Sequence, residues 1–127
     1  MMNVLVTGCD GQLGNEFKKI ALYEDDINWI FTDIDTLNVC NEAEILDFFN
    51  KNKIDVCINC AAYTAVDKAE DDEATARLVN ATSVSYLAKT CKSHDSLLIH
   101  ISTDYVFDGT SEHAYREDDT VSPNSVY

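Results

Sequence analysis

Three of the chain's four glycines lie in one segment, TGCDGQLG, at Gly8, Gly11 and Gly14. An apolar run, Val4 to Val6, precedes the segment, and apolar residues at helical spacing follow it. A turn without Cβ atoms lets the backbone approach a pyrophosphate, whose charge the free N–H groups of the helix start can bind. The segment therefore predicts strand, phosphate-binding turn and helix, although a purely structural turn would use glycine as well.

The remainder of the chain alternates apolar runs with segments of helical periodicity. Further strands are expected at 28–33, 55–62 and 97–102, with one helix after Asn41 and a longer one over 72–93. This alternation predicts parallel pairing through right-handed crossovers. We expect one α/β domain over residues 1–127, a Rossmann-like doubly wound parallel sheet with helices on both faces, truncated after its fourth strand.

Three local features refine this outline. Asn41, with Glu44 three residues further on, is a candidate N-cap. One face of the long helix is expected to carry Asn80, Val84, Leu87, Ala88 and Cys91. After Thr103 the periodicity stops, which predicts a long loop leading to a new helix at 124–127, with Pro123 in its first turn.

Charge and cysteine content exclude several classes of function. Nine Lys and Arg against 23 Asp and Glu give a net charge of -14, so long-range repulsion disfavours nucleic acids and anionic membrane surfaces as partners. No signal peptide and no apolar run near the roughly 18 residues of a membrane span is found. We therefore expect a cytoplasmic protein, with its five cysteines as reduced thiols.

Asp33 closes the second expected strand, 25 residues after Gly8. A carboxylate there can accept hydrogen bonds from both ribose hydroxyls of an adenosine, although Asp also occurs in simple turns. No Lys or Arg lies between Gly8 and Gly14 or directly after Asp33. A 2′-phosphate would meet a carboxylate and no cation, which predicts that NADH is preferred over NADPH.

No metal site is expected from the cysteines and histidines. Cys57 and Cys60 have CxxC spacing, but residues three apart in a strand point to opposite faces, so their sulfur atoms cannot share a metal or form a disulfide. The histidines at 94, 100 and 113 show no paired ligand spacing. His100, inside the fourth expected strand, is predicted to be buried and hydrogen-bonded.

Two groups of polar residues lie where a ligand can reach them. Asn80 falls on the apolar face of the long helix, where a buried amide must be hydrogen-bonded, as a structural anchor, a site residue or both. The segment Ser102 to Tyr105 follows the fourth expected strand. Open parallel sheets bind ligands beyond the carboxyl ends of their strands, so this segment is expected to share a crevice with the glycine turn. Strand ends also use such residues structurally.

Four segments together resemble the dTDP-4-dehydrorhamnose reductase family of extended short-chain dehydrogenases: TGCDGQLG at 7–14, NCAAYTAVDKAE at 59–70, NATSV at 80–84 and STDYVFDG at 102–109. Many extended short-chain enzymes share the GxxGxxG spacing of the first segment, whereas the second and fourth are much more specific. SPNSVY at 122–127 resembles the family's approach to a Tyr-x-x-x-Lys pair.

The resemblance implies an oxidoreductase that uses NADH or NADPH to reduce the C4 ketone of dTDP-4-dehydro-6-deoxy-L-mannose, giving dTDP-L-rhamnose for surface polysaccharides. The cofactor-binding residues that it implies are Gly8 and Gly14 in the turn, Gly11, Gln12 and Leu13 at the pyrophosphate, Asp33 at the ribose, Asn38 and Val39 at the adenine, and Ala62, Tyr63 and Thr64 at the nicotinamide. The catalytic residues that it implies are Thr103, Tyr127 and Asn80, with Thr103 and Asp104 facing the sugar. Asn38 stands where the family commonly has Asp, which weakens a hydrogen bond to the adenine amine.

The resemblance assigns Tyr127 the role of proton donor. Hydride addition to a ketone leaves an alkoxide, and a phenol within hydrogen-bond reach can protonate it when a nearby ammonium favours the phenolate. The family has a lysine four residues after this tyrosine and a far longer chain. We therefore expect an N-terminal portion of a longer reductase, which alone binds dinucleotide weakly and does not turn over.

Two alternatives stay open at this point. One is another extended short-chain enzyme, an epimerase or dehydratase, which would keep and recycle its cofactor. The other is a regulatory dinucleotide-binding subunit, because the β subunit of methionine adenosyltransferase resembles the same family. The resemblance also allows a homodimer and a bound Mg2+ ion, although no carboxylate cluster in the sequence stands out as a site for it.

Overall fold

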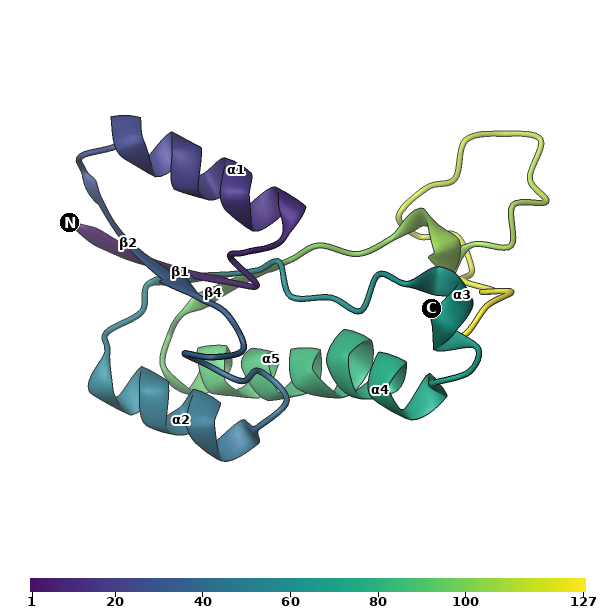
Figure 1. Ribbon diagram of the computed structural model, residues 1–127. Coiled ribbons are helices and arrows are strands. Elements are labelled where there is room, and N and C mark those ends of the chain that lie inside the picture. The colour runs from purple at the N-terminus through teal and green to yellow at the C-terminus, as the bar shows by residue number, and fades with distance from the viewer.

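A computed structural model describes all residues, 1–127. One four-stranded parallel sheet has helices on both faces, which confirms the predicted fold class (Figure 1). The strands are β1 (Met2–Thr7), β2 (Ile27–Thr32), β3 (Val56–Asn59) and β4 (Leu97–His100). The helices are α1 (Gln12–Ile20), α2 (Glu42–Lys51), α3 (Val66–Ala69), α4 (Glu73–Arg77) and α5 (Ser83–Ser93).

The order of the strands creates a switch point between β1 and β3. The strands lie in the order β2-β1-β3-β4, so the chain moves to one side of β1 for β2 and to the other side for β3. Thr7 is in register with both Thr32 and Asn59, which aligns the carboxyl ends of these three strands. Sheets of this kind bind ligands outside the carboxyl ends of the strands at the switch point.

Alternate residues of the central strands supply two separate cores. Leu5 and Cys57 face α2 and α5, whereas Val4, Val6 and Ile58 face the opposite side, where Phe17 of α1 packs. Cys57 lies in the first core and Cys60 packs against the second. The structure thus confirms that the CxxC cysteines point to opposite faces, and all five cysteines are free thiols.

The start of α2 confirms the predicted N-cap. The side-chain oxygen of Asn41 accepts hydrogen bonds from the backbone N–H groups of Ala43 and Glu44, at 3.1 and 3.3 Å. The Asn41 amide group in turn donates to Glu44 Oε1 at 2.8 Å. These bonds satisfy N–H groups that have no partner within the helix.

The long helix differs from its prediction. A π-helical turn, Leu78–Thr82, separates α4 from α5, and the buried residues of α5 are Ser83, Leu87, Thr90 and Cys91. Ala88 is exposed and Val84 only half-buried, so the predicted face was partly wrong. A π turn adds one residue to a turn of the helix. The regular helical spacing from Asn80 to the residues of α5 therefore assigns Val84 and Ala88 wrongly to the buried face.

The chain beyond β4 is a long loop, as predicted, with one 3-10 turn at Asp104–Val106. The expected helix at 124–127 is absent, and Asn124 and Ser125 form only a bend. His100 is hydrogen-bonded but exposed, since β4 is an edge strand, so the prediction of a buried histidine was wrong. No helix combines the length and hydropathy of a membrane-spanning segment.

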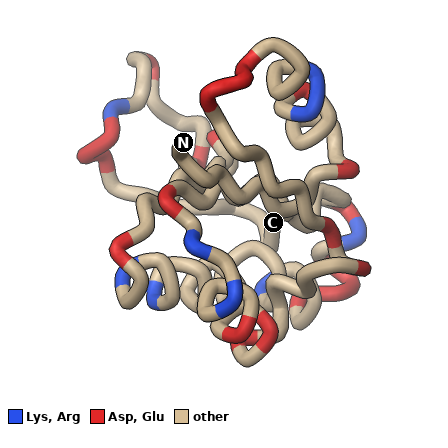
Figure 2. The backbone as a smooth tube through the Cα atoms, turned by 90° about the vertical axis from the view of Figure 1, so that its left-hand side faces the viewer, with Lys and Arg blue, Asp and Glu red and all other residues tan.

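Acidic residues occur in many different parts of the chain, and basic residues are fewer (Figure 2). The negative charge is therefore a property of the whole surface, and any anionic ligand needs a local binding site.

Candidate functional site

The glycine turn brings β1, β3 and α1 into close contact. Gly8 has a φ of +63°, and a Cβ atom there would lie 2.6 Å from the backbone nitrogen of Ala61. A Cβ on Gly14 would lie 2.5 Å from the Cα atom of Cys9. At the start of α1, Gly11 provides no side-chain cap, so the first N–H groups of this helix are free to bind an anion.

A cleft of about 340 Å³ opens beside this turn, which is within the usual size range of ligand sites. Six of the predicted cofactor residues line it: Gly8, Gly11, Asp33, Asn38, Val39 and Ala62. The cleft lies at the switch point, since Gly8 follows β1 and Ala62 follows β3. No Lys or Arg is among the lining residues.

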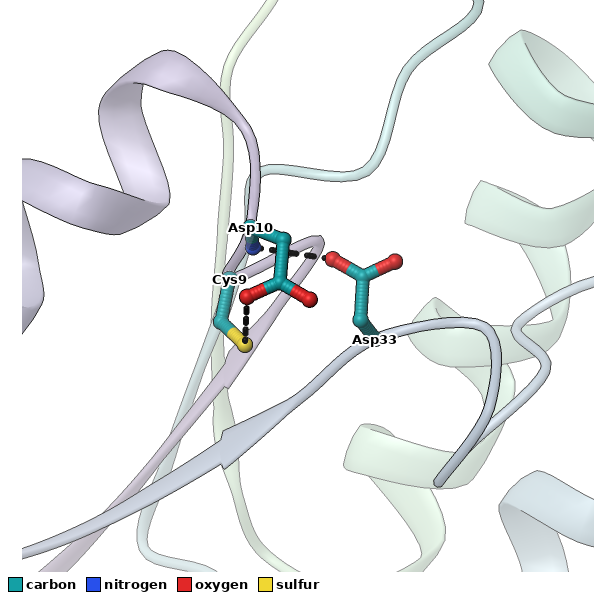
Figure 3. A group of neighbouring side chains, drawn as sticks. All are labelled: Cys9, Asp10 and Asp33. Carbon is teal, nitrogen blue, oxygen red and sulfur yellow. Dashed lines mark hydrogen bonds between the residues drawn. The ribbon is translucent and has the colours of Figure 1, made fainter.

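Asp33 is held at the end of β2 by two backbone donors. Its Oδ2 atom accepts from the N–H group of Asp10 at 2.9 Å (Figure 3). Its Oδ1 atom accepts from the N–H group of Ile34 at 2.8 Å. Each carboxylate oxygen keeps one lone pair that a ribose hydroxyl could use. Asp33 is half-buried, so its side chain is both fixed and accessible.

One cation lies near this end of the cleft, although no Lys or Arg lies between Gly8 and Gly14 or directly after Asp33. Lys18, in the second turn of α1, places its Nζ atom 2.6 Å from Asp10 Oδ1. The Lys18 ammonium lowers the pKa of the Asp10 carboxyl group, and Asp10 raises the pKa of Lys18. Lys18 is not next to Asp10 in the sequence, and only the folding of α1 brings its side chain back to the glycine turn.

The atoms of Cys9, Asp10 and Asp33 lie close enough together to share a metal ion (Figure 3). However, burial raises the pKa of the Cys9 thiol, whose Sγ atom donates to Asp10 Oδ1 at 3.6 Å. A protonated thiol is a poor ligand, and Lys18 already neutralises Asp10. Hydrogen bonds and the ion pair with Lys18 hold the three side chains in this arrangement.

Asn38 uses part of its hydrogen-bonding capacity locally. Its Oδ1 atom accepts from the N–H group of Cys40 at 3.0 Å, which folds the loop between β2 and α2. One lone pair on that oxygen and both amide hydrogens remain for a ligand.

A second, smaller cavity of about 140 Å³ lies beside the cleft. It is lined by four of the predicted residues, Ala62, Asn80, Thr103 and Tyr127. Ala62 lines both cavities, so the cleft and the smaller cavity adjoin each other at the segment after β3. Thr103 and Tyr127 are half-buried, with part of each surface open to a ligand.

Asn80 holds the segment that separates these two cavities. Its Oδ1 atom accepts from the N–H group of Tyr63 at 2.7 Å, and its Nδ2 atom donates to the Tyr63 carbonyl at 3.0 Å. The π-helical turn that contains Asn80 sets this position, and such turns are frequent at functional sites.

The position of Tyr127 depends on two contacts that the sequence did not reveal. Glu70, just after α3, accepts a hydrogen bond from the backbone N–H group of Val126 at 2.9 Å. The rings of Tyr105 and Tyr127 meet edge to face, with centroids 5.7 Å apart. The C-terminal segment therefore lies against α3, as Figure 1 shows.

A row of polar side chains across the strand ends was also missed. The Thr7 hydroxyl donates to Asn59 Oδ1 at 2.6 Å, and Asn59 Nδ2 donates to His100 Nδ1 at 3.1 Å. Nδ1 therefore acts as an acceptor, which leaves the proton of the neutral ring on Nε2. Desolvation lowers the pKa of His100, which favours this neutral form. A polar residue at the last position of a buried strand is the signal that could have identified Asn59.

The remaining predicted residues lie outside these two cavities. Asp104 lines a separate cavity with Tyr105 and Asp108. The other five, from the glycine turn and the segment after β3, line neither cavity: Gln12, Leu13, Gly14, Tyr63 and Thr64.

Comparison with known proteins matches residues 2–127 to the RmlD substrate binding domain. The dTDP-4-dehydrorhamnose reductase of Aggregatibacter actinomycetemcomitans is 38% identical over 127 residues, which is 100% of this chain and 43% of that protein. The crystal structure of a dTDP-4-dehydrorhamnose reductase from Clostridium acetobutylicum has 42% identity and a TM-score of 0.95, covering 99% of this chain and 45% of that one.

A third comparison includes a cofactor. The dTDP-4-dehydrorhamnose reductase of Bacillus anthracis, solved in complex with NADP, is 30% identical with a TM-score of 0.95, and the match covers 100% of this chain and 45% of that one. The chain thus spans less than half the length of these relatives. Because one family model matches it from residue 2 to residue 127 and its backbone follows that of these reductases, the chain belongs to the RmlD substrate binding domain family.

Proposed function

We propose that this chain binds a nicotinamide dinucleotide and contributes Thr103 and Tyr127 to the reduction of a dTDP-linked 4-keto sugar. The observation that carries the proposal is the meeting of the two cavities at Ala62. A dinucleotide lying along the larger cleft would end beside the smaller cavity, which Thr103 and Tyr127 line.

The residues present fit such a cofactor. Gly8 and Gly14 let the glycine turn pack closely against Ala61 and Cys9, which brings the start of α1 to the end of β1. The uncapped start of α1 offers N–H groups at Gln12 and Leu13 to a pyrophosphate. Asp33 would accept the ribose hydroxyls, and Asn38 with Val39 would contact the adenine. Tyr63 and Thr64, after Ala62, would lie at the nicotinamide end.

The bound cofactor would supply the hydride for the C4 ketone of dTDP-4-dehydro-6-deoxy-L-mannose. In this proposal Thr103 donates a hydrogen bond to the ketone oxygen, and Tyr127 gives its phenolic proton to the same oxygen as negative charge develops there. Asp104 would face the sugar from the separate cavity that it lines with Tyr105 and Asp108. Asn80 supports the site indirectly through its bonds to Tyr63.

We also propose a preference for NADH, because Asp33 presents a carboxylate where the adenosine ribose would lie. The relative from Bacillus anthracis was solved with NADP, so a 2′-phosphate can be bound within this family. The preference is therefore a difference in affinity, which titration of the chain with each cofactor measures directly.

A chimera provides the decisive experiment. Residues 1–127 would replace the matching 43% of the dTDP-4-dehydrorhamnose reductase of Salmonella typhimurium, with which they share 38% identity. We expect the chimera to oxidise NADH when supplied with the sugar-nucleotide ketone, and Tyr127→Phe to reduce kcat by about 100-fold or more without lowering the melting temperature. A folded chimera that binds dinucleotide but shows no turnover would contradict the assigned roles of Thr103 and Tyr127.

A further inference from the structure

The side chain of Asp10 has no role in the proposed function, yet Asp10 contacts both Asp33 and the Lys18 ammonium. Its backbone N–H group donates to Asp33, while its carboxylate holds the Lys18 ammonium at 2.6 Å (Figure 3 shows Asp10 and Asp33). The Asp10 side chain is 70% exposed and that of Lys18 35% exposed, so both reach the surface beside the cleft.

The geometry points to Asp10 as a residue that determines cofactor specificity, because its carboxylate withholds Lys18 from the 2′-phosphate of NADPH. The inference rests on the proposed function, since it places the adenosine ribose at Asp33. Asp10 does not line the cleft, and it would lower the affinity for NADPH without changing the affinity for NADH.

The charge of the 2′-phosphate explains why Asp10 should affect the binding of NADPH and not that of NADH. A 2′-hydroxyl needs only an acceptor, which Asp33 supplies. A 2′-phosphate brings a charge of about -1.5 to -2 and would meet the carboxylates of Asp33 and Asp10. Lysine binds phosphate as a point charge on a flexible stem, so Lys18 could turn to such a group, but only by leaving Asp10 unpaired beside it.

A variant without the Asp10 charge tests whether Asp10 keeps Lys18 away from the 2′-phosphate. Asp10→Asn keeps the backbone N–H group that holds Asp33 but no longer pairs with the ammonium. We expect this variant to bind NADPH about five- to tenfold more tightly and NADH within about twofold of the wild type. The gain should shrink as ionic strength rises, because salt screens an exposed ammonium–phosphate pair.

A double-mutant cycle tests whether Asp10 acts through Lys18. Dissociation constants of NADH and NADPH would be measured by NMR titration of the isotope-labelled chain for the wild type, Asp10→Asn, Lys18→Met and the double variant. The inference requires that the gain in NADPH affinity disappear when Lys18 is Met. If Asp10→Asn improves NADPH binding equally without Lys18, Asp10 acts by direct repulsion and the inference is overturned.

The chain contains a matched control. Glu16 and Lys19 form an ion pair of the same length, 2.6 Å, on α1, and neither residue lines the cleft. Glu16→Gln changes the net charge as Asp10→Asn does, so an equal gain for NADPH would reveal a general charge effect and refute the inference. If the folded wild type binds neither dinucleotide, the proposed function fails first, and the inference with it.

Discussion

The side chain of Asn80 holds the backbone of Tyr63 through two hydrogen bonds. Asn80 Oδ1 accepts one from the Tyr63 N–H group, and Asn80 Nδ2 donates the other to the Tyr63 carbonyl. These residues lie 17 positions apart in the chain. The bonds fix the segment after β3 against the π-helical turn, and that segment forms the boundary between the two cavities.

Asn80→Leu should therefore weaken both folding and cofactor binding. The substitution leaves a part-buried N–H group and a carbonyl without partners, which costs about 1–3 kcal/mol of the free energy of unfolding. Urea denaturation measures the stability, and titration with NADH measures the binding. Asn28→Ala removes an exposed side-chain bond to Asn3 and should change stability by less than about 0.5 kcal/mol. Equal effects of the two variants would contradict the role given to Asn80.

Gly8 and Gly109 test whether close packing or backbone strain makes glycine necessary. Both have positive φ, at +63° and +76°, but a Cβ on Gly109 would meet nothing within 4 Å. Gly109→Ala should cost only the strain of the left-handed conformation, about 1–2 kcal/mol. Gly8→Ala adds a clash with Ala61, of about 1–3 kcal/mol more, and should abolish dinucleotide binding. Thermal unfolding of both variants compares these costs, and similar losses would show that the contact with Ala61 is unimportant.

Asp55 gives a prediction about pH. Its carboxylate accepts from the Asn3 N–H group at 2.8 Å, and this bond, with Lys53 nearby, lowers its pKa from 3.8. A lowered folded-state pKa contributes stability above the unfolded pKa, and this contribution is lost as the pH falls through the folded value. Asp55→Asn should therefore destabilise the protein at neutral pH, and its difference from the wild type should decrease below about pH 4.

Urea denaturation at several pH values measures that difference. Asp25→Asn, which removes an exposed carboxylate outside these contacts, serves as the control. A difference between wild type and Asp55→Asn that stays constant down to pH 2 would show that the bond to Asn3 does not depend on the charge.

The cysteines should differ in their rates of alkylation. Cys57 and Cys91 are 0% and 2% exposed, whereas Cys40 and Cys60 are only half-buried. The native protein should therefore be labelled at Cys40 and Cys60 long before Cys57 and Cys91, because the reagent must reach the sulfur atom. Mass spectrometry after timed exposure to iodoacetamide measures the order. A Cys57–Cys60 disulfide in the native protein would contradict the strand geometry.

The local sequence was sufficient for the four strands, for α1 and α2, and for several of the residues that line the cleft. Alternating apolar runs predicted the parallel sheet, Asn41 predicted the start of α2, and the position of Asp33 after β2 placed it in the cleft. These predictions succeeded because each depends on residues close together in the chain, where periodicity and capping act.

Contacts between distant segments could be decided only by the tertiary structure. The register of the strands aligns Thr7, Asn59 and His100, and the turn of α1 returns Lys18 to Asp10. The π-helical turn at Asn80 interrupts the helical spacing, and sequence periodicity does not reveal it. Spacing along the sequence therefore determined which elements form and where the glycine turn lies, whereas the packing of those elements determined which polar groups meet, because a hydrogen bond or ion pair depends on distance in space.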